Sequence, residues 1–477
     1  MALSQLAANE LRKLGYLFYV APAEDVLIES LEQKKHLSLE VVPTFALLVA
    51  LEHIFNWWHN KAHRFSTNDA LTSISQGMLM EISGVLNAGL SIVAYIWVYE
   101  NYRLGELPWN SWITWAIAFL AVDFGYYWIH RAAHEINIFW AGHQVHHSSE
   151  FYNLTTALRQ SVIQEQFIFI IYLPLALFIP PQVYAVHKEL NLLYQFWIHS
   201  EAVTKIGPLE YILNTPSHHR VHHGVNRYCI DKNFAGVLII WDRMFGTFTP
   251  EADAVVYGLT HPIQTFDPYK IQFGYLEYLI QRFRDEKHWA DKLGVLFKGP
   301  GWMPGKPRLG LIEDIPDVHA PVPVWNPAVS SWIAPYAFIH YVVLTADYMT
   351  LLAQKDVPGC YWSLLVQAGY IFLTLVQLGA FLEGRQGARL SEPLRLVAYM
   401  TLCHFVPSYG FVARFGTHWG PRVGLAVQCI YATSFAFMLG HLAFGGPLKK
   451  AAFNNTKKQY SNAHGDGDLA PEIGKDR

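Results

Sequence analysis

The sequence predicts an all-α integral membrane protein of about nine apolar helices, with a histidine-rich helical cap that holds a di-metal site. The 477 residues are 52% apolar and 15% charged, whereas soluble domains carry about 25% charged residues. Several apolar runs reach the roughly 20 residues that a helix needs to cross a bilayer. Three short motifs, HxxxH, HxxHH and HxxHH, concentrate histidine in two places. The composition thus predicts the membrane, and the motifs predict the metal.

The first half of the chain holds apolar runs of membrane length, at about 41–57, 76–100 and 111–129. A fourth run, 161–181, ends at Pro180-Pro181, where proline stops a helix. The more mixed stretch 184–203 follows directly. We expect 161–181 and 184–203 to form a helical hairpin that returns to the side of the membrane from which it started.

Residues 204–326 are more charged than the chain as a whole and contain many turn residues, which predicts a cap outside the bilayer. Four more apolar runs follow, at about 328–353, 361–382, 396–413 and 423–446. We expect the polar tail to be disordered. The expected domains are an N-terminal segment, membrane helices with the first histidine clusters, the cap with the third cluster, C-terminal membrane helices and the tail, at 1–37, 38–203, 204–326, 327–447 and 448–477.

Basic residues near the ends of the apolar runs indicate the orientation, because cytosolic loops carry an excess of Lys and Arg. With four C-terminal spans, the side of the cap holds the basic residues Arg385, Arg389, Arg395, Lys449 and Lys450. Lys61 and Arg64 also lie on that side if the next two helices span the membrane. Arg414 and Arg422 count against this orientation. We therefore expect the cap and its histidines to face the cytosol, so that the glycosylation sequons at Asn153 and Asn454 stay unmodified.

Charge and cysteine content exclude other classes of protein. The net charge is −3 without a basic block, which argues against nucleic-acid binding. The four cysteines are scattered without a CxxC spacing, which argues against a disulfide framework or a thiolate zinc site.

The histidine motifs have spacings that suit metal ligands on helices. His130 and His134 are four residues apart, so they share one helical face. In each HxxHH motif we expect the first two histidines to share a face, and the third to point about 100° away toward a second metal. Three or four imidazoles for each of two ions leave positions open for dioxygen or water. The eight motif histidines are His130, His134, His143, His146, His147, His219, His222 and His223.

Four further polar residues near the motifs are candidates for the site. His199 is a possible ninth ligand, since it shares a face with Gln195 near the same membrane boundary, whereas His218 has no motif position and favours a supporting role or exposure. Glu135 directly follows His134, so its carboxylate is a candidate acceptor for a ligand N–H or a cofactor's amino group. Asp123 lies two helical turns before His130, and a charge so deep in an apolar helix needs a partner.

The chemistry of imidazole leaves the identity of the metal open. Imidazole suits Fe, Zn, Cu and Ni. A nitrogen-only site with open positions beside a lipid favours activation of dioxygen by iron, while a zinc-dependent hydrolase remains open. A metal or lipid transporter is the non-enzymatic alternative, although transport sites lie near the bilayer midplane on broken helices.

The motifs and their flanking sequences resemble the fatty acid hydroxylase superfamily, the membrane di-iron enzymes that include sterol desaturases. The match extends beyond the histidines into the strings NLLYQFWIHSE, YGLTHPIQTF and FKGPGWMPGKPRLGL. It is close over roughly residues 70–315, and these strings indicate the branch of the superfamily that cleaves ether lipids. The segments that carry the resemblance are 122–161, 172–187, 191–201, 214–248, 257–266 and 297–311.

This resemblance implies a specific activity. Such enzymes are multi-pass proteins of the endoplasmic reticulum membrane that hydroxylate the carbon next to the ether oxygen of alkylglycerols and lyso-alkyl phospholipids. Cleavage to a fatty aldehyde and a glycerol derivative uses dioxygen, two iron ions and tetrahydrobiopterin. The resemblance implies that the eight motif histidines bind iron and makes Glu135 the candidate contact for the pterin. The alternative within the superfamily is a di-iron hydroxylase or desaturase of sterols or fatty acyl chains.

Overall fold

A computed structural model describes residues 10–87, 89–164, 169–355, 357, 359–405 and 416–448. Within these residues the chain is helical and forms no strand, apart from two isolated β-bridges that pair Leu213 with Leu238 and Gly224 with Tyr257. The prediction of an all-α protein is therefore confirmed.

The main helices are α4 (Val42–Trp58), α5 (Thr67–Leu86), α6 (Leu90–Tyr102), α7 (Trp112–Glu135), α8 (Asn137–His147), α10 (Pro181–Ile198), α11 (Pro216–His222), α12 (Ile240–Phe245), α13 (Pro268–Asp285), α14 (Trp289–Phe297), α15 (Ile333–Gln354), α16 (Tyr361–Leu382), α17 (Ala388–Phe405) and α19 (Gly416–Phe444). The short elements are α2 (Ala23–Val26), α3 (Leu37–Glu40), η1 (Leu31–Gln33), η2 (Ala62–Arg64), η3 (Thr156–Leu158), η4 (Phe169–Leu177), η5 (Gly207–Tyr211), η6 (Arg227–Cys229) and η7 (Ile312–Asp314).

Five helical segments of the described chain are long and apolar enough to cross a membrane, and a sixth forms if the bent pair α5 and α6 counts as one span. The five are Leu31–Trp58, Trp112–Glu135, Ile333–Gln354, Tyr361–Leu382 and Arg422–Phe444. This is the pattern of a multi-pass membrane protein. The count of nine apolar helices stays a prediction, because part of the run 396–413 lies outside the described residues, as does the tail from 449.

The first arm of the predicted hairpin differs from a continuous helix. In the described part of 161–181 the chain forms turns and then the nine-residue 3₁₀ helix η4, with Pro174 inside it. Proline lacks the N–H of the α-helical ladder and crowds the preceding turn, so it interrupts an α-helix. The second arm does form, as α10, which begins at Pro181 and packs on α7 and α6.

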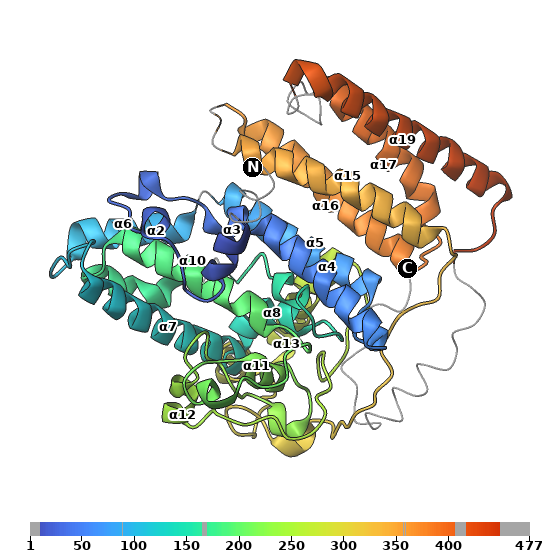
Figure 1. The fold of residues 1–477 in the computed structure, drawn as a ribbon. Coiled ribbons are helices and arrows are strands. Elements are labelled where there is room, and N and C mark those ends of the chain that lie inside the picture. Colours follow the sequence, from blue (N-terminus) through green and yellow to red (C-terminus); the bar gives the residue numbers. More distant parts are fainter. Residues whose placement is uncertain are drawn as a thin grey trace.

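The helices form two groups, which Figure 1 shows apart. The C-terminal helices α15, α16, α17 and α19 lie side by side, with α15 against α16 and α17 against α19. The other group contains α7, α10 and the shorter helices α8, α11 and α13. Helix α5 packs against both α15 and α16 and thus joins the C-terminal helices to the rest.

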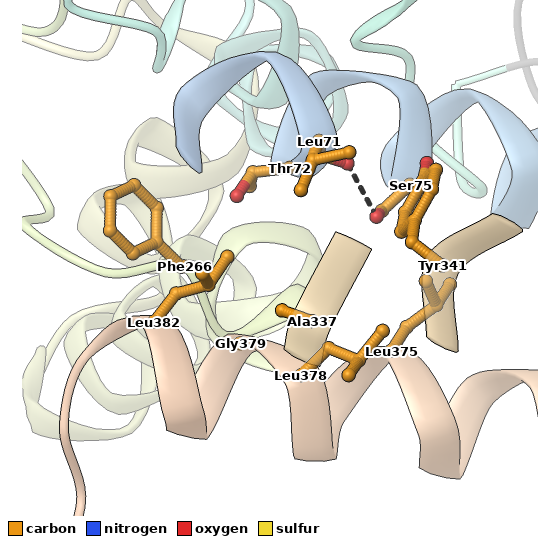
Figure 2. Close-up of a pocket in the computed structure, with 10 residues that line it drawn as sticks. All are labelled: Leu71, Thr72, Ser75, Phe266, Ala337, Tyr341, Leu375, Leu378, Gly379 and Leu382. Atoms are coloured by element: carbon orange, nitrogen blue, oxygen red, sulfur yellow. Dashed lines mark hydrogen bonds between the residues drawn. The ribbon is translucent and has the colours of Figure 1, made fainter. Parts of the chain in front are cut away.

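A small apolar pocket marks this junction between α5 and the C-terminal helices. Figure 2 shows Leu71 and Thr72 of α5 facing Leu378 of α16, with Phe266 at one end. Gly379 is required here, since a Cβ on it would lie 2.3 Å from the Phe266 carbonyl oxygen. The close approach of backbone at this point therefore fixes α16 beside the segment that leads into α13.

The sequon at Asn153 lies inside the folded chain. Its side chain is 2% exposed, and its Oδ1 accepts hydrogen bonds from the Thr155 backbone N–H and hydroxyl. A glycan at Asn153 is incompatible with this burial, so an unmodified Asn153 would not by itself report orientation. Asn454 lies outside the described residues.

Candidate metal centre

Two helices that meet at a sharp corner carry the first histidines. Helix α7 ends at Glu135, and α8 begins at Asn137 after one extended residue, so the last turn of α7 faces α8. The third motif lies on the short helix α11, which Pro216 starts. Proline suits this first-turn position because its backbone N–H would be unpaired there in any case. His199 caps the C-terminus of α10 and faces α11.

The structure brings the predicted histidines together in two adjoining groups, and it includes His199. Within each group the candidate ligand atoms lie within 4.8 Å of one another, and all nine residues are buried. The five-histidine group comprises His130, His134, His143, His147 and His222. The four-histidine group comprises His146, His199, His219 and His223. Contact between the groups is direct, since the rings of His147 and His223 stack with centroids 4.3 Å apart.

We expected the first two histidines of each HxxHH motif to share a face and the third to point toward a second metal, and this prediction was wrong. In both motifs the first and third histidines share a group, and the middle one belongs to the other group. Residues four apart on a helix differ by about 40°, whereas those three apart differ by about 60° in the opposite sense. Thus His143 and His147 point to one ion position, and His146 reaches the other.

Hydrogen bonds to backbone carbonyls set the tautomers of four rings. His130 Nδ1 donates to the Phe234 carbonyl oxygen, and His146 Nδ1 donates to that of Arg159. His199 Nδ1 donates to the Gln195 carbonyl oxygen, and His222 Nδ1 donates to that of Lys232. These four distances are 2.7–3.0 Å. A carbonyl only accepts, so each Nδ1 carries the proton and each Nε2 presents a lone pair. This arrangement orients imidazole as a metal ligand.

The lone pairs of these rings face one another across short distances. His199 Nε2 lies 3.1 Å from His146 Nε2 and 3.0 Å from His219 Nε2. His130 Nε2 lies 3.0 Å from His143 Nε2, while His143 Nδ1 contacts the Gln164 amide oxygen. In the His130–His143 and His146–His199 pairs both rings carry the proton on Nδ1, so no proton remains to bridge the facing Nε2 atoms. A cation between them removes the repulsion, so the donor set fits a metal in each group.

Burial keeps the rings neutral, as metal ligands must be. It lowers the pKa of His143 to about 4, and it lowers the pKa of His147 and His222 well below the ordinary value of histidine. Among the described residues, the Nε2 atoms of His222 and His223 have no hydrogen-bond partner. A buried polar atom without a partner is costly, and a bound cation would satisfy both.

A loop that the sequence did not single out supports the five-histidine group. Residues 231–239 present the Lys232 and Phe234 carbonyls to His222 and His130, and Asp231 Oδ1 lies 3.5 Å from His134 Nδ1. The backbone at Asp231 adopts the left-handed region, with φ +54°. This turn aims successive polar groups at the site.

Two fully buried carboxylates hold this loop. Asp242 accepts hydrogen bonds from the backbone N–H groups of Phe234 and Ala235, both at 2.8 Å. Asp123 accepts from the N–H groups of Val237 and Leu238 at 2.8 and 3.0 Å. Asp123 thus has the partners that its depth requires, and its role is to position the loop that holds the histidines. Nothing in the sequence marks Asp242, because an acidic residue in the first turn of a helix is common.

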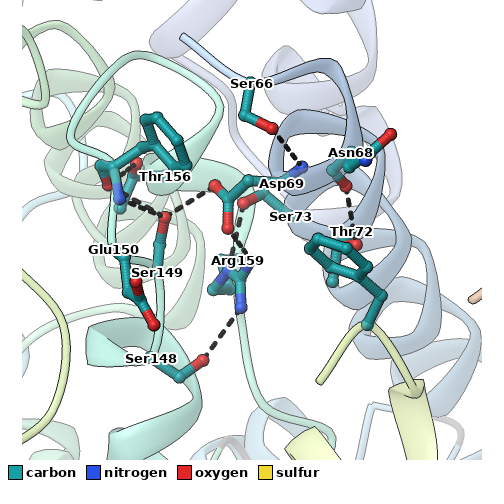
Figure 3. Close-up of polar contacts among 12 residues, drawn as sticks. Ser66, Asn68, Asp69, Thr72, Ser73, Ser148, Ser149, Glu150, Thr156 and Arg159 are labelled. Carbon is teal, nitrogen blue, oxygen red and sulfur yellow. Dashed lines mark hydrogen bonds and ion pairs between the residues drawn. The ribbon is translucent and has the colours of Figure 1, made fainter. Parts of the chain in front are cut away.

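A second network supports the four-histidine group from the side of α5, as Figure 3 shows. The Arg159 carbonyl accepts from His146, and the Arg159 guanidinium is 2% exposed. It donates to Asp69 Oδ1 at 2.6 Å, Ser148 Oγ at 2.9 Å and Ser73 Oγ at 3.0 Å. Asp69 also accepts from the Ser149 hydroxyl at 2.7 Å. Sequence analysis missed Arg159 as well.

Glu135 and His218 lie beside the centre but outside both groups. The Glu135 carboxylate accepts from Arg131 Nε at 2.7 Å and from Arg308 Nη1 at 2.9 Å, so it already pairs with two guanidinium groups. His218 is buried, with its ring edge-on to Phe248. The alternative that His218 is simply exposed is therefore excluded.

The geometry alone defines a class of protein, namely a helical membrane-type protein whose histidine motifs form two adjoining groups that could each hold a metal ion. The family model described as fatty acid hydroxylase matches residues 115–247, the segment that carries all nine histidines. The predicted resemblance is therefore confirmed. A second model, described as alkylglycerol monooxygenase C-terminal domain, matches residues 333–411.

Curated relatives identify the family within that class. The alkylglycerol monooxygenase of Homo sapiens is 49% identical over 82% of this chain and 87% of its own length. Those of Xenopus tropicalis and Danio rerio are each 48% identical, over 81% and 84% of this chain and 86% and 91% of their own lengths. The chain belongs to the alkylglycerol monooxygenase family. No solved structure matches it.

Proposed function

We propose that this chain is a tetrahydrobiopterin-dependent monooxygenase that cleaves the ether bond of alkylglycerols and lyso-alkyl phospholipids. The observation that carries the proposal is the pair of adjoining histidine groups in a chain of the alkylglycerol monooxygenase family. The relatives' name supplies the substrate class, and the buried, nitrogen-only donor set suits a redox metal. Iron is the metal we propose, with one ion in each group.

The proposed reaction balances as a two-electron monooxygenation. One oxygen atom of dioxygen enters the C–H bond next to the ether oxygen, and the other leaves as water. Tetrahydrobiopterin supplies two electrons and two protons. The resulting hemiacetal collapses to a fatty aldehyde and a glycerol derivative with a free hydroxyl. When bound, the iron ions supply the activation of dioxygen that side chains lack.

The residues of the chain hold and shield this chemistry. The carbonyl-bound Nδ1–H groups fix the imidazole orientations before any ion binds, so little reorganisation is needed. All nine histidines are at most 6% exposed, which keeps bulk water from the centre. The four-histidine group offers fewer imidazoles than the five-histidine group, and we assign to it more open positions for dioxygen and the substrate carbon.

We propose that the pterin binds next to Glu135. The Glu135 side chain is 15% exposed, one residue after His134, so a cofactor can approach it from outside the centre. A carboxylate can accept two hydrogen bonds from a 2-amino-pyrimidinone edge in the way it accepts a guanidinium. The cofactor edge would take the place of Arg308, whose side chain is 49% exposed. Glu135→Gln should raise the pterin concentration required while iron stays bound; loss of iron would place Glu135 at the metal instead.

The proposed location is the endoplasmic reticulum membrane with residues 204–326 in the cytosol. Because Asn153 is buried, orientation needs a new sequon in an exposed part of the cap. Ala252→Asn with Ala254→Thr places one at two exposed positions. We expect no glycan after expression in mammalian cells, whereas a glycan would put the cap in the lumen.

The decisive test is aldehyde release from a long-chain alkylglycerol by solubilised membranes, with and without tetrahydrobiopterin. We expect pterin-dependent and dioxygen-dependent aldehyde that disappears in His146→Ala. Aldehyde released without dioxygen would favour a zinc hydrolase. Intact, iron-loaded protein that releases none would point to a sterol or fatty acyl substrate. The matched control is His319→Ala, which changes a histidine whose side chain is 72% exposed and which belongs to neither group.

A further inference from the structure

We propose that each metal ion has its own buried, carboxylate-anchored support, so that either ion can be lost without the other. Asp242 would control the ion of the five-histidine group, and the Asp69–Arg159 pair would control the ion of the four-histidine group. This inference rests on the proposed di-metal site. It identifies positioning residues, which act on the ions through the histidines.

The support of the five-histidine group runs through one short loop. His130 and His222 both donate to carbonyls of residues 231–239, at 2.8 and 2.9 Å. Asp242 is 0% exposed and fixes this loop at the residue that receives His130, through the Phe234 N–H. Thr247 completes the arrangement, because its hydroxyl donates to Asp242 Oδ1 at 2.7 Å. Moving the loop would therefore release two of five rings.

The support of the four-histidine group lies on the α5 side of the site. His146 donates to the Arg159 carbonyl at 3.0 Å. The Arg159 side chain is fixed by Asp69 and Ser73 of α5, so the carbonyl position depends on that ion pair. Figure 3 shows the guanidinium between Asp69 and Ser148. Releasing Arg159 would free His146 but leave the loop 231–239 in place.

Asp123 cannot separate the two ions, which makes Asp242 the better probe. Asp123 Oδ1 accepts from Asn191 at 2.8 Å, and Asn191 in turn accepts from Gln195. The Gln195 carbonyl holds His199 of the four-histidine group. Asp123 thus connects to both groups, whereas the hydrogen bonds of Asp242 lie on the loop side.

The test counts iron in purified full-length protein that carries Asp242→Asn or Asp69→Asn. At position 242 an asparagine turns one acceptor into a donor that faces a backbone N–H, and at position 69 it removes the charge that pairs with the Arg159 guanidinium. We expect each variant to keep about half of the wild-type iron, with the signal of a single high-spin ion in place of a coupled pair. The double variant should keep almost none. Asp285→Asn, at an exposed position on α13, is the matched control.

Milder variants keep the test valid if either asparagine variant fails to fold. Thr247→Val and Ser73→Ala each remove one hydroxyl from one support. We expect each to accelerate a different phase of iron release to a chelator. Loss of both ions in either single variant, or acceleration of the same phase by both, would overturn the inference. Wild-type protein with fewer than two ions would instead contradict the proposed di-metal function.

Discussion

Replacing Arg159 with methionine is the sharpest test of how the centre is held. The change removes three hydrogen bonds from a fully buried guanidinium and leaves Asp69 buried without its cation. Breaking a buried pair by removing one partner costs about 3–5 kcal/mol. At roughly 2 °C per kcal/mol for a large chain, the melting temperature should fall by about 6–10 °C.

A double-mutant cycle separates the uncompensated charge from lost packing. Adding Asp69→Leu to Arg159→Met removes the isolated carboxylate, so the double variant should be more stable than Arg159→Met alone. We expect a coupling of at least about 1 kcal/mol, within the range of about 0.5–3 kcal/mol for residues of one network. The assay heats the protein in detergent and measures the fraction that remains folded by fluorescence-detected size-exclusion chromatography. Additive losses, with no coupling, would refute the buried ion pair as the support of this region.

Three further predictions concern the loop, the metals and a buried thiol. Gly236→Ala should destabilise the chain and lower its iron content, because the added Cβ would lie 2.9 Å from both Asp123 Oδ1 and Asn191 Oδ1. Unchanged iron content in this variant would contradict the role of the loop 231–239 in holding the metal. Chelation of iron should lower the melting temperature of the wild-type protein more than that of His146→Ala, since an ion that binds the folded chain stabilises it by mass action. Equal chelator-induced shifts in the two proteins would contradict this. Burial raises the pKa of Cys229 to about 12, so a maleimide should not label Cys229 at pH 8 until the chain unfolds, as peptide mapping would report.

The membership of the centre was predictable because its signal is local. Histidines four apart on one helix face one direction whatever surrounds them, so HxxxH and HxxHH indicated ligands directly. His199 was harder, since it stands alone in sequence, yet its place at the end of α10 puts it against His146 and His219. The assignment of rings to the two groups failed for His146 and His147 and likewise for His222 and His223, because it depends on what lies opposite each face.

The supports of the centre could not be predicted from sequence. Asp242 and Arg159 are charged residues of common types, and only burial to 0% and 2% reveals that they hold the site. The partners of Asp242 are largely backbone groups, which no side-chain pattern records. Two of the three partners of the Arg159 guanidinium, Asp69 and Ser73, lie on α5, far away in the sequence. Tertiary contact decides these two features, whereas Pro174 acts locally and interrupts the α-helix that hydrophobicity predicted.

The way the helices divide between the two groups would let two ions act together in chemistry and yet bind separately. Helices α8 and α11 contribute to both groups, through His143 and His147 against His146 and through His222 against His219. Helix α7 contributes to the five-histidine group alone, and His199 at the end of α10 to the four-histidine group alone. The shared helices fix the two histidine groups relative to each other, as the proposed joint reaction of two ions with dioxygen would require. The unshared helices allow each environment to be adjusted through its own support, so one ion position can differ in open coordination without disturbing the other.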